Sequence, residues 1–221
     1  MYKACIFDLD GTIADTVESI AYVGNKTLAH FHLPSIPVKD YNFYAGNGAD
    51  ELVRKMLEAV PGGDKVDYEE VRKLYRRWFE EDPFYHVKPF EGIVELLEGL
   101  KEEGMKIAVL SNKPHRAAIE VVEKIFGREM FHKVQGQTEK VPRKPSPKGA
   151  LTIAGEFAVK PEECLYLGDT DTDMETGHRA GMFTIGVTWG FRPRKELEDH
   201  RADLIVDAPE EILKFVKESN T

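Results

Sequence analysis

Cysteine is scarce in this sequence. Among 221 residues it has only Cys5 and Cys164, each inside an apolar run. Neither cysteine has the CxxC or Cys/His spacing of a zinc site, and the 7 histidines show no spacing of metal ligands either. We therefore expect two buried, reduced thiols, a pattern that fits a protein of the cytoplasm.

Long apolar runs and an excess of positive charge are lacking as well. No run approaches the roughly 18–20 residues that span a bilayer, and acidic residues interrupt the short apolar stretch at the N-terminus, which has no signal-peptide pattern. With 30 basic against 39 acidic side chains, the formal net charge is −9. Nucleic acids and anionic membranes attract clustered lysine and arginine, so neither is an expected partner.

The composition provides enough apolar material for a packed core. Hydrophobic residues make up 42% of the chain and charged residues 31%, which excludes wholesale disorder. Short apolar runs typical of buried strands occur at 3–9, 105–110, 163–167, 182–188 and 202–206, with a weaker candidate at 131–135. Amphipathic helical patterns lie at 92–103, 114–126, 147–157, 172–181 and 208–218. This alternation predicts an α/β fold with a parallel sheet.

One segment, residues 15–86, interrupts the alternation. It offers helical patterns near 15–31, 47–59 and 67–81 and no convincing buried strand, and prolines and glycines punctuate it. We expect a helical insert between the first strand and the rest of the sheet. The predicted division is a core domain of residues 1–14 and 87–221 and a helical domain of residues 15–86.

Polar residues gather where the predicted strands end. Asp8 and Asp10 lie at the end of the first strand, Ser111 to Lys113 follow the strand at 105–110, and Gly168 to Asp173 follow the strand at 163–167. Lys144 opens a helix. In an open parallel sheet, ligands bind beyond the carboxyl ends of the strands. Four polar clusters at one edge therefore indicate a functional site.

The carboxylates of this site need a cation. Several of them at one edge repel one another unless positive charge is present. Oxygen ligands suit Mg²⁺, which often binds beside a substrate phosphate, so we predict a Mg²⁺ site. Asp8 can then act as a nucleophile that forms an aspartyl phosphate, and Asp10 can protonate the leaving alcohol and later activate water. Donors for the phosphate oxygens come from Ser111, Asn112 and Lys144.

Four motifs resemble those of the haloacid dehalogenase superfamily of phosphohydrolases. In chain order they are DLDGT from Asp8, SNK from Ser111, KPSP from Lys144 and GDTDTD from Gly168. They stand in the family order, and the resemblance covers essentially the whole chain. It implies a Rossmann-like core with an inserted helical cap domain. The implied activity is that of a phosphoric monoester hydrolase, which acts on a small phosphorylated metabolite in the cytoplasm as a monomer or homodimer.

The resemblance also implies a role for each motif residue. Asp8 is the nucleophile and a Mg²⁺ ligand, Asp10 is the general acid/base and binds the metal through its backbone carbonyl, and Asp169 is the remaining protein ligand. Asp173 orients the water shell of the metal. The transferring phosphoryl group is held by Ser111, Asn112 and Lys144. Dehalogenases of the superfamily lack an aspartate at the position of Asp10, so its presence favours phosphoryl chemistry.

One loop of the helical insert is similar to cap loops of phosphoglycolate phosphatases. Glycines on both sides of Asn47 let the backbone approach a small ligand closely. We expect Asn47 to donate hydrogen bonds to the substrate, and the glycine amides, that of Gly46 among them, to bind a carboxylate. The TWGFR stretch that starts at Thr188 also resembles a sequence of the phosphoglycolate phosphatase subfamily. The basic pair Arg76–Arg77 is expected on a solvated face.

Several alternatives remain beside phosphoglycolate phosphatase. Inorganic pyrophosphatase activity occurs in close relatives. A phosphosugar mutase of the same superfamily usually has a cap histidine after the first motif, whereas this sequence has Val17 to Ile20 there. A non-catalytic phosphate-binding regulatory protein typically loses a catalytic carboxylate, whereas Asp8, Asp10 and Asp169 are all present here. These features favour a phosphatase.

Overall fold

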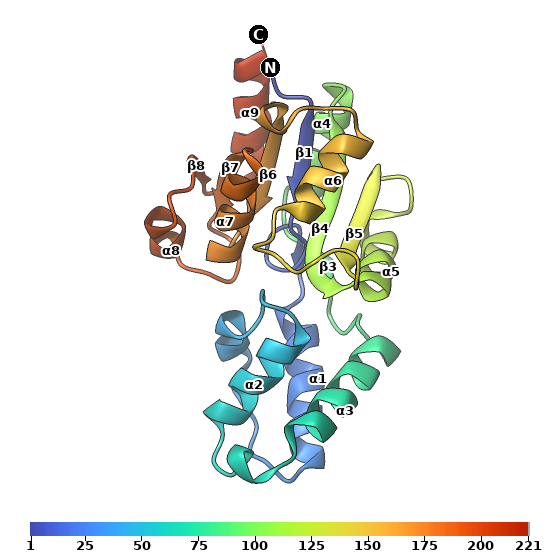
Figure 1. Cartoon of the computed structure of the whole chain (residues 1–221), viewed down its shortest axis with the longest axis vertical. Coiled ribbons are helices and arrows are strands. Elements are labelled where there is room, and N and C mark those ends of the chain that lie inside the picture. Colours follow the sequence, from blue (N-terminus) through green and yellow to red (C-terminus); the bar gives the residue numbers. More distant parts are fainter. Residues whose placement is uncertain (221) are drawn as a thin grey trace.

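A six-stranded parallel sheet forms the centre of the molecule. The structure is a computed structural model and describes residues 1–220. The strand order is β5-β4-β1-β6-β7-β8 (Figure 1). All six strands that the sequence predicts are present, the weak candidate included: β1 Ala4–Phe7, β4 Lys106–Pro114, β5 Lys133–Gln137, β6 Cys164–Gly168, β7 Phe183–Val187 and β8 Leu204–Val206.

Helices cover both faces of this sheet. They are α4 Ile93–Glu102, α5 His115–Phe126, α6 Lys148–Glu156, α7 Asp171–Ala180, α8 Arg194–Asp199 and α9 Pro209–Asn220. Cys5 and Phe7 of β1 join one apolar cluster with α4, α5 and α9, whereas Ala4 and Ile6 join another with α6 and α7. Because alternate side chains are buried on opposite faces, the strands read as continuous apolar runs. The two cysteines are free and buried, as predicted.

Helix α8 is the one core helix that the sequence analysis did not predict. It spans only six residues, Arg194–Asp199, five of them charged. Leu197 is its one buried residue, so no apolar periodicity marks it. Helices this short leave too weak a pattern for detection. The 3₁₀ turns η1 Val38–Phe43, η2 Gly63–Lys65 and η3 Pro161–Glu163 escaped prediction for the same reason.

The inserted segment folds into a helical unit with its own apolar cluster. Its helices are α1 Val17–His30, α2 Ala49–Ala59 and α3 Tyr68–Glu81, close to the predicted ranges. Val71, Tyr75 and Phe79 of α3 are buried at helical spacing against α1 and α2. In Figure 1 this unit lies below the sheet, on the side to which β1 points. The helices therefore face the carboxyl ends of the strands.

Two short strands connect the helical unit to the sheet. The chain leaves through β2, Ala14–Asp15, and returns through β3, Lys88–Pro89. The two pair in antiparallel fashion, so both crossings lie side by side. Over residues 1–220, the helices include none with the length and hydropathy that a bilayer crossing requires.

Candidate active site

The predicted site residues meet at the carboxyl ends of three neighbouring strands. Asp8 directly follows β1, Ser111 to Lys113 form the end of β4, and Asp169 directly follows β6. Because β1 lies between β4 and β6, these groups share one edge of the sheet. Their side chains are almost completely buried; Asp8 is 3% exposed and Asp169 is 0% exposed. The structure thus brings the motif residues together as the sequence predicts.

Three buried carboxylates form the centre of the site. Asp8, Asp169 and Asp173 each place an oxygen within 4.8 Å of the other two. Lys144 Nζ lies 2.7 Å from Asp8 Oδ1 and 2.7 Å from Asp173 Oδ1. When all four groups are ionised, three negative charges face one positive charge. The cluster therefore has an excess of negative charge on side chains that are almost completely buried.

The burial of this excess charge shifts the pKa values of the cluster. Burial, together with the charge of Asp173, raises the pKa of Asp169 from its usual 3.8 to about 7. Burial also raises the pKa of Asp8 well above its usual range, against the opposing effect of Lys144. Burial alone would lower the pKa of Lys144, but Asp173 and Asp8 raise it well above its usual value. The lysine therefore stays charged, and the carboxylates still need a further cation.

This donor set fits a divalent metal ion. Carboxylate oxygens are the ligands of a hard cation such as Mg²⁺, and two positive charges would balance the cluster. Asp173 is the carboxylate least available as a ligand. Its Oδ2 accepts hydrogen bonds from Thr170 Oγ1 at 2.7 Å and from Thr170 N at 3.2 Å, and these bonds form part of the N-terminal cap of α7. Its Oδ1 accepts a hydrogen bond from Lys144 Nζ. Asp8 and Asp169 accept fewer hydrogen bonds than Asp173, so they are better placed to bind an ion.

Close backbone packing holds Asp169 in place. Its Oδ1 accepts a hydrogen bond from Thr12 Oγ1 at 3.0 Å, and its Oδ2 accepts one from Phe191 N at 2.7 Å. A Cβ atom on Gly190 would lie 2.3 Å from Asp169 Cβ, and one on Gly11 would lie 2.4 Å from Asp169 Oδ2. Only glycine fits at either position. This contact explains the glycines of the DLDGT and TWGFR stretches, which lie far apart in the sequence.

The amide of Asn112 connects three parts of the site. Its Oδ1 accepts a hydrogen bond from Lys144 N at 2.8 Å, and its Nδ2 donates to Lys144 O at 3.3 Å and to Gly46 O at 3.1 Å. Ser111 Oγ accepts a hydrogen bond from Lys113 N at 3.1 Å, which orients the Ser111 hydroxyl at the end of β4. The three residues predicted to hold phosphate, Ser111, Asn112 and Lys144, therefore lie together.

Lys113 has a contact that the sequence did not reveal. Its Nζ lies 2.6 Å from Asp10 Oδ1, and its side chain is only 4% exposed. The same Nζ lies 4.8 Å from the ring centroid of Phe79 in α3. Lys113 thus contacts both the predicted acid/base and the helical unit. No local pattern encodes this pairing, because it joins residues 103 positions apart.

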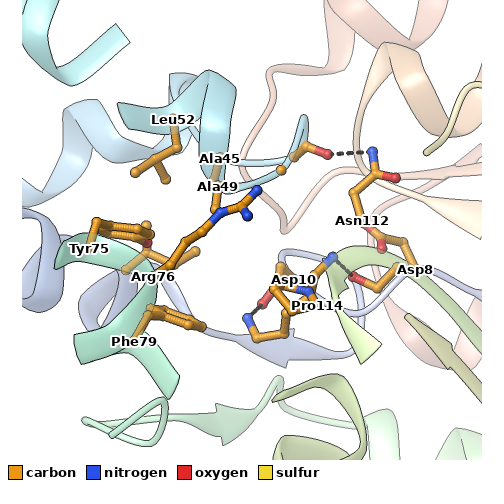
Figure 2. A pocket seen from close by; sticks show the side chains of 15 residues that line it. Asp8, Asp10, Ala45, Ala49, Leu52, Tyr75, Arg76, Phe79, Asn112 and Pro114 are labelled. Atoms are coloured by element: carbon orange, nitrogen blue, oxygen red, sulfur yellow. Dashed lines mark hydrogen bonds and ion pairs between the residues drawn. The ribbon is translucent and has the colours of Figure 1, made fainter. Parts of the chain in front are cut away.

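A pocket lies between the sheet edge and the helical unit. The core lines it with Asp8, Asp10, Ser111, Asn112, Lys113 and Pro114, and the helical unit with Ile20, Ala45, Gly46, Gly48, Ala49, Leu52, Tyr75, Arg76 and Phe79 (Figure 2). The core side is polar, whereas the opposite wall is mainly apolar. Such a space suits a small ligand with a charged end held at the sheet.

Core side chains hold the loop that contains Gly46 and Asn47. Gly46 lines the pocket, and its carbonyl oxygen accepts a hydrogen bond from Asn112 Nδ2. The side chain of Asn47 makes a different contact: its Oδ1 accepts from Thr172 Oγ1 at 2.8 Å, and its carbonyl accepts from Arg143 at 3.0 Å. Asn47 is not among the residues that line the pocket. Its contacts instead attach the loop to the core.

Comparison with known proteins gives consistent matches. A family model described as haloacid dehalogenase-like hydrolase matches residues 5–187. The phosphoglycolate phosphatase of Aquifex aeolicus (strain VF5) is 31% identical over 214 residues, 97% of this chain and 96% of that protein. The phosphoglycolate phosphatase of Mannheimia succiniciproducens is 30% identical over 220 residues, 97% of this chain and 98% of that protein.

A solved structure agrees with these matches. A Lactobacillus delbrueckii subsp. bulgaricus protein that carries a provisional phosphoglycolate phosphatase name superposes with a TM-score of 0.89 at 28% identity. The match covers 97% of this chain and 98% of that one. Together, the parallel sheet and the aspartate site at its edge define an α/β phosphohydrolase. The chain belongs to the haloacid dehalogenase-like hydrolase family, and it is a phosphoric monoester hydrolase similar to phosphoglycolate phosphatases.

Proposed function

We propose that this protein is a Mg²⁺-dependent phosphatase that hydrolyses 2-phosphoglycolate through a phosphoaspartate on Asp8. The single observation that carries the mechanism is the position of Asp8. It is buried at the pocket, and its Oδ1 lies 2.7 Å from Lys144 Nζ. The choice of substrate rests on the relatives named phosphoglycolate phosphatase, which match over nearly their full length.

Each step of the proposed reaction uses a residue at the pocket. Ser111 and Asn112, which line the pocket, and Lys144, which contacts Asp8 at 2.7 Å, orient the phosphoryl group of the substrate beside Asp8. An oxygen of Asp8 attacks phosphorus as the bond to the substrate oxygen breaks, and a protonated Asp10 gives its proton to that leaving oxygen. A Mg²⁺ ion bound by Asp8, Asp169 and the Asp10 carbonyl would supply positive charge for the transferring group.

The second step regenerates the enzyme. Asp10, now ionised, takes a proton from a water molecule, whose oxygen attacks the phosphorus of the phosphoaspartate. The bond between phosphorus and the Asp8 oxygen breaks, which releases inorganic phosphate and free Asp8. Lys113, whose Nζ lies 2.6 Å from Asp10 Oδ1, holds the Asp10 side chain in position for both proton transfers.

We also propose a division of labour between two domains. Residues 1–14 and 87–221 act as the catalytic core, and residues 15–86 act as a cap that closes over the site and keeps bulk water out. Hydrogen bonds from Asn112, Arg143, Thr172 and Arg192 to the loop of residues 45–47 support this role. We place the enzyme in the cytoplasm, where its two cysteines would stay reduced.

Phosphate release by the purified protein tests the proposal. With Mg²⁺ the enzyme should hydrolyse 2-phosphoglycolate with a higher kcat/KM than pyrophosphate or a sugar phosphate, and EDTA should abolish turnover. The Asp8→Asn variant should lose activity by at least about 1000-fold, because the amide is a far weaker nucleophile. An exposed aspartate, Asp199, provides the matched control, since Asp199→Asn should keep full activity. Full turnover by the Asp8 variant would refute the mechanism.

A further inference from the structure

The pocket has one charged side chain that the proposed chemistry does not use. Two cationic residues line it, Lys113 from the core and Arg76 from the helical unit. Lys113 is paired with Asp10 at 2.6 Å. Arg76 extends from α3 into the pocket, among apolar neighbours that include Leu52 and Phe79 (Figure 2). The end of the pocket away from the phosphate-holding residues therefore contains a cation.

The contacts of Arg76 hold it in place without neutralising its surroundings. Its Nη2 donates to Asp50 Oδ1 at 2.6 Å. The same carboxylate contacts Arg143 Nη2 at 3.1 Å and Arg72 Nη1 at 3.5 Å. Glu69 pairs with Arg72 at 2.5 Å on the outer side. Three guanidinium groups thus share two carboxylates, and the group keeps a net positive charge at the pocket wall.

We propose that Arg76 binds a carboxylate at the end of the substrate opposite its phosphate. The inference rests on the proposed function and adds the residue that selects a phosphomonoester with a second anionic group. A guanidinium has five N–H donors in a planar fork that matches a carboxylate. Asp50 uses part of the fork and fixes its direction, which leaves donors for a ligand. The Arg76 side chain is 42% exposed, so its remaining donors are accessible to a ligand in the pocket.

This assignment explains both what the pocket accepts and what it rejects. A substrate with a terminal carboxylate pairs with Arg76 while its phosphate lies at the sheet edge. A substrate with an apolar end would cover the remaining N–H donors of Arg76 without giving them an acceptor, which costs binding free energy. Arg143 and Arg192 do not fill this role, because neither lines the pocket and both donate to the backbone of the loop at residues 45–47.

Two esters with the same skeleton test the proposal. Ethyl phosphate has a methyl group at the position where 2-phosphoglycolate has its carboxylate. For Arg76→Met, we expect kcat/KM for 2-phosphoglycolate to fall at least about 30-fold, mainly through KM, because a charge-assisted hydrogen bond is lost. Activity on ethyl phosphate should stay within about threefold of the wild type, since that ester never uses the carboxylate contact.

The neighbouring arginine supplies the matched control. Arg77 pairs with Glu81 at 3.8 Å, and its side chain is 64% exposed. Arg77→Met should leave kcat/KM unchanged for both esters. Arg76→Lys, which keeps the charge and loses the fork, should show a smaller loss on 2-phosphoglycolate than Arg76→Met.

The outcomes separate this inference from the proposed function. A wild-type enzyme that hydrolyses neither ester would refute the proposed function itself. A wild-type enzyme that hydrolyses both with equal kcat/KM would overturn the role of Arg76 alone. Equal losses on both esters in Arg76→Met and Arg76→Lys would show that Arg76 only supports the fold, and no loss in either variant would equally overturn the inference.

Discussion

Removal of the metal should make the stability of this protein depend on pH in an unusual direction. In the metal-free protein, burial and the charge of Asp173 raise the pKa of Asp169 from 3.8 to about 7. Between pH 3.8 and about pH 7, Asp169 holds a proton in the folded state and has lost it in the unfolded state. The free energy of unfolding therefore falls as pH rises through this range, and stability is greatest at the acidic end.

The pKa difference sets the size of the effect. At 1.36 kcal/mol per pKa unit, the change from 3.8 to about 7 corresponds to about 4 kcal/mol, an upper bound for Asp169 alone. Exposed carboxylates such as Asp207 have lowered pKa values and act in the opposite sense, but only below about pH 4. Between pH 5 and about 7.5 His132, whose pKa is lowered by burial and by Lys106, also acts in the opposite sense, so the comparison with Asp169→Asn isolates the buried cluster.

Urea unfolding in EDTA across this window provides the assay. The wild type should lose stability as the pH rises, and added Mg²⁺ should restore more stability at pH 7.5 than at pH 5. Asp169→Asn removes one buried charge, so the variant in EDTA should be more stable than the wild type at pH 7.5 and should depend less on pH, with the raised pKa of Asp8 causing the remaining dependence. Asp199→Asn, at an exposed position paired with Lys195, should behave as the wild type. A metal-free wild type whose stability is flat or rises between pH 5 and 7.5 would refute the reasoning.

Two further substitutions test single contacts of the site. Lys113→Met removes the ion pair that holds the Asp10 side chain in position for proton transfer, so kcat/KM should fall about tenfold more for ethyl phosphate, whose leaving group needs a proton, than for p-nitrophenyl phosphate; equal losses would contradict the link to Asp10. Gly190→Ala places a Cβ atom 2.3 Å from Asp169 Cβ and should lower the unfolding free energy by about 2 kcal/mol or more. Gly155→Ala, in open space on α6, is the matched control and should leave stability equal or slightly higher.

The sequence predicted the sheet well because its strands are buried on both faces. In β6, Leu165 and Leu167 face one apolar cluster while Cys164 and Tyr166 face the other, and the run is therefore apolar throughout. Such runs are easy to recognise between amphipathic helices. Helix α8 escaped because one buried leucine in six residues leaves no periodicity.

The site was predictable in its motifs but not in its long-range contacts. Each motif is local, so the residues at the strand ends could be placed together by topology alone. The contact of Thr12 with Asp169 joins positions 157 residues apart, and the pair of Lys113 with Asp10 spans 103. No periodicity encodes such pairs. They depend on how the two halves of the sheet and the helical unit pack.

Arg76 shows most clearly what sequence reasoning left open, because its side chain is 42% exposed and also lines the pocket. A solvated face was expected for Arg76–Arg77, and Arg77 is indeed exposed. Arg76 instead lies next to the apolar stripe of α3 formed by Val71, Tyr75 and Phe79, at the boundary that faces the pocket. Helical periodicity identifies the buried stripe of a helix. It does not show that one flank of the stripe borders a cavity, because that depends on the domain packed opposite.

The most direct test of the mechanism is chemical trapping of the enzyme during turnover. Sodium borohydride reduces an acyl phosphate of aspartate to homoserine, which peptide mass spectrometry can locate. With Mg²⁺ and 2-phosphoglycolate, homoserine should appear at position 8 of the wild type, and it should be absent when substrate is omitted. Trapping at another aspartate, or turnover at full rate with no modified residue at position 8, would contradict the assignment of Asp8 as the nucleophile.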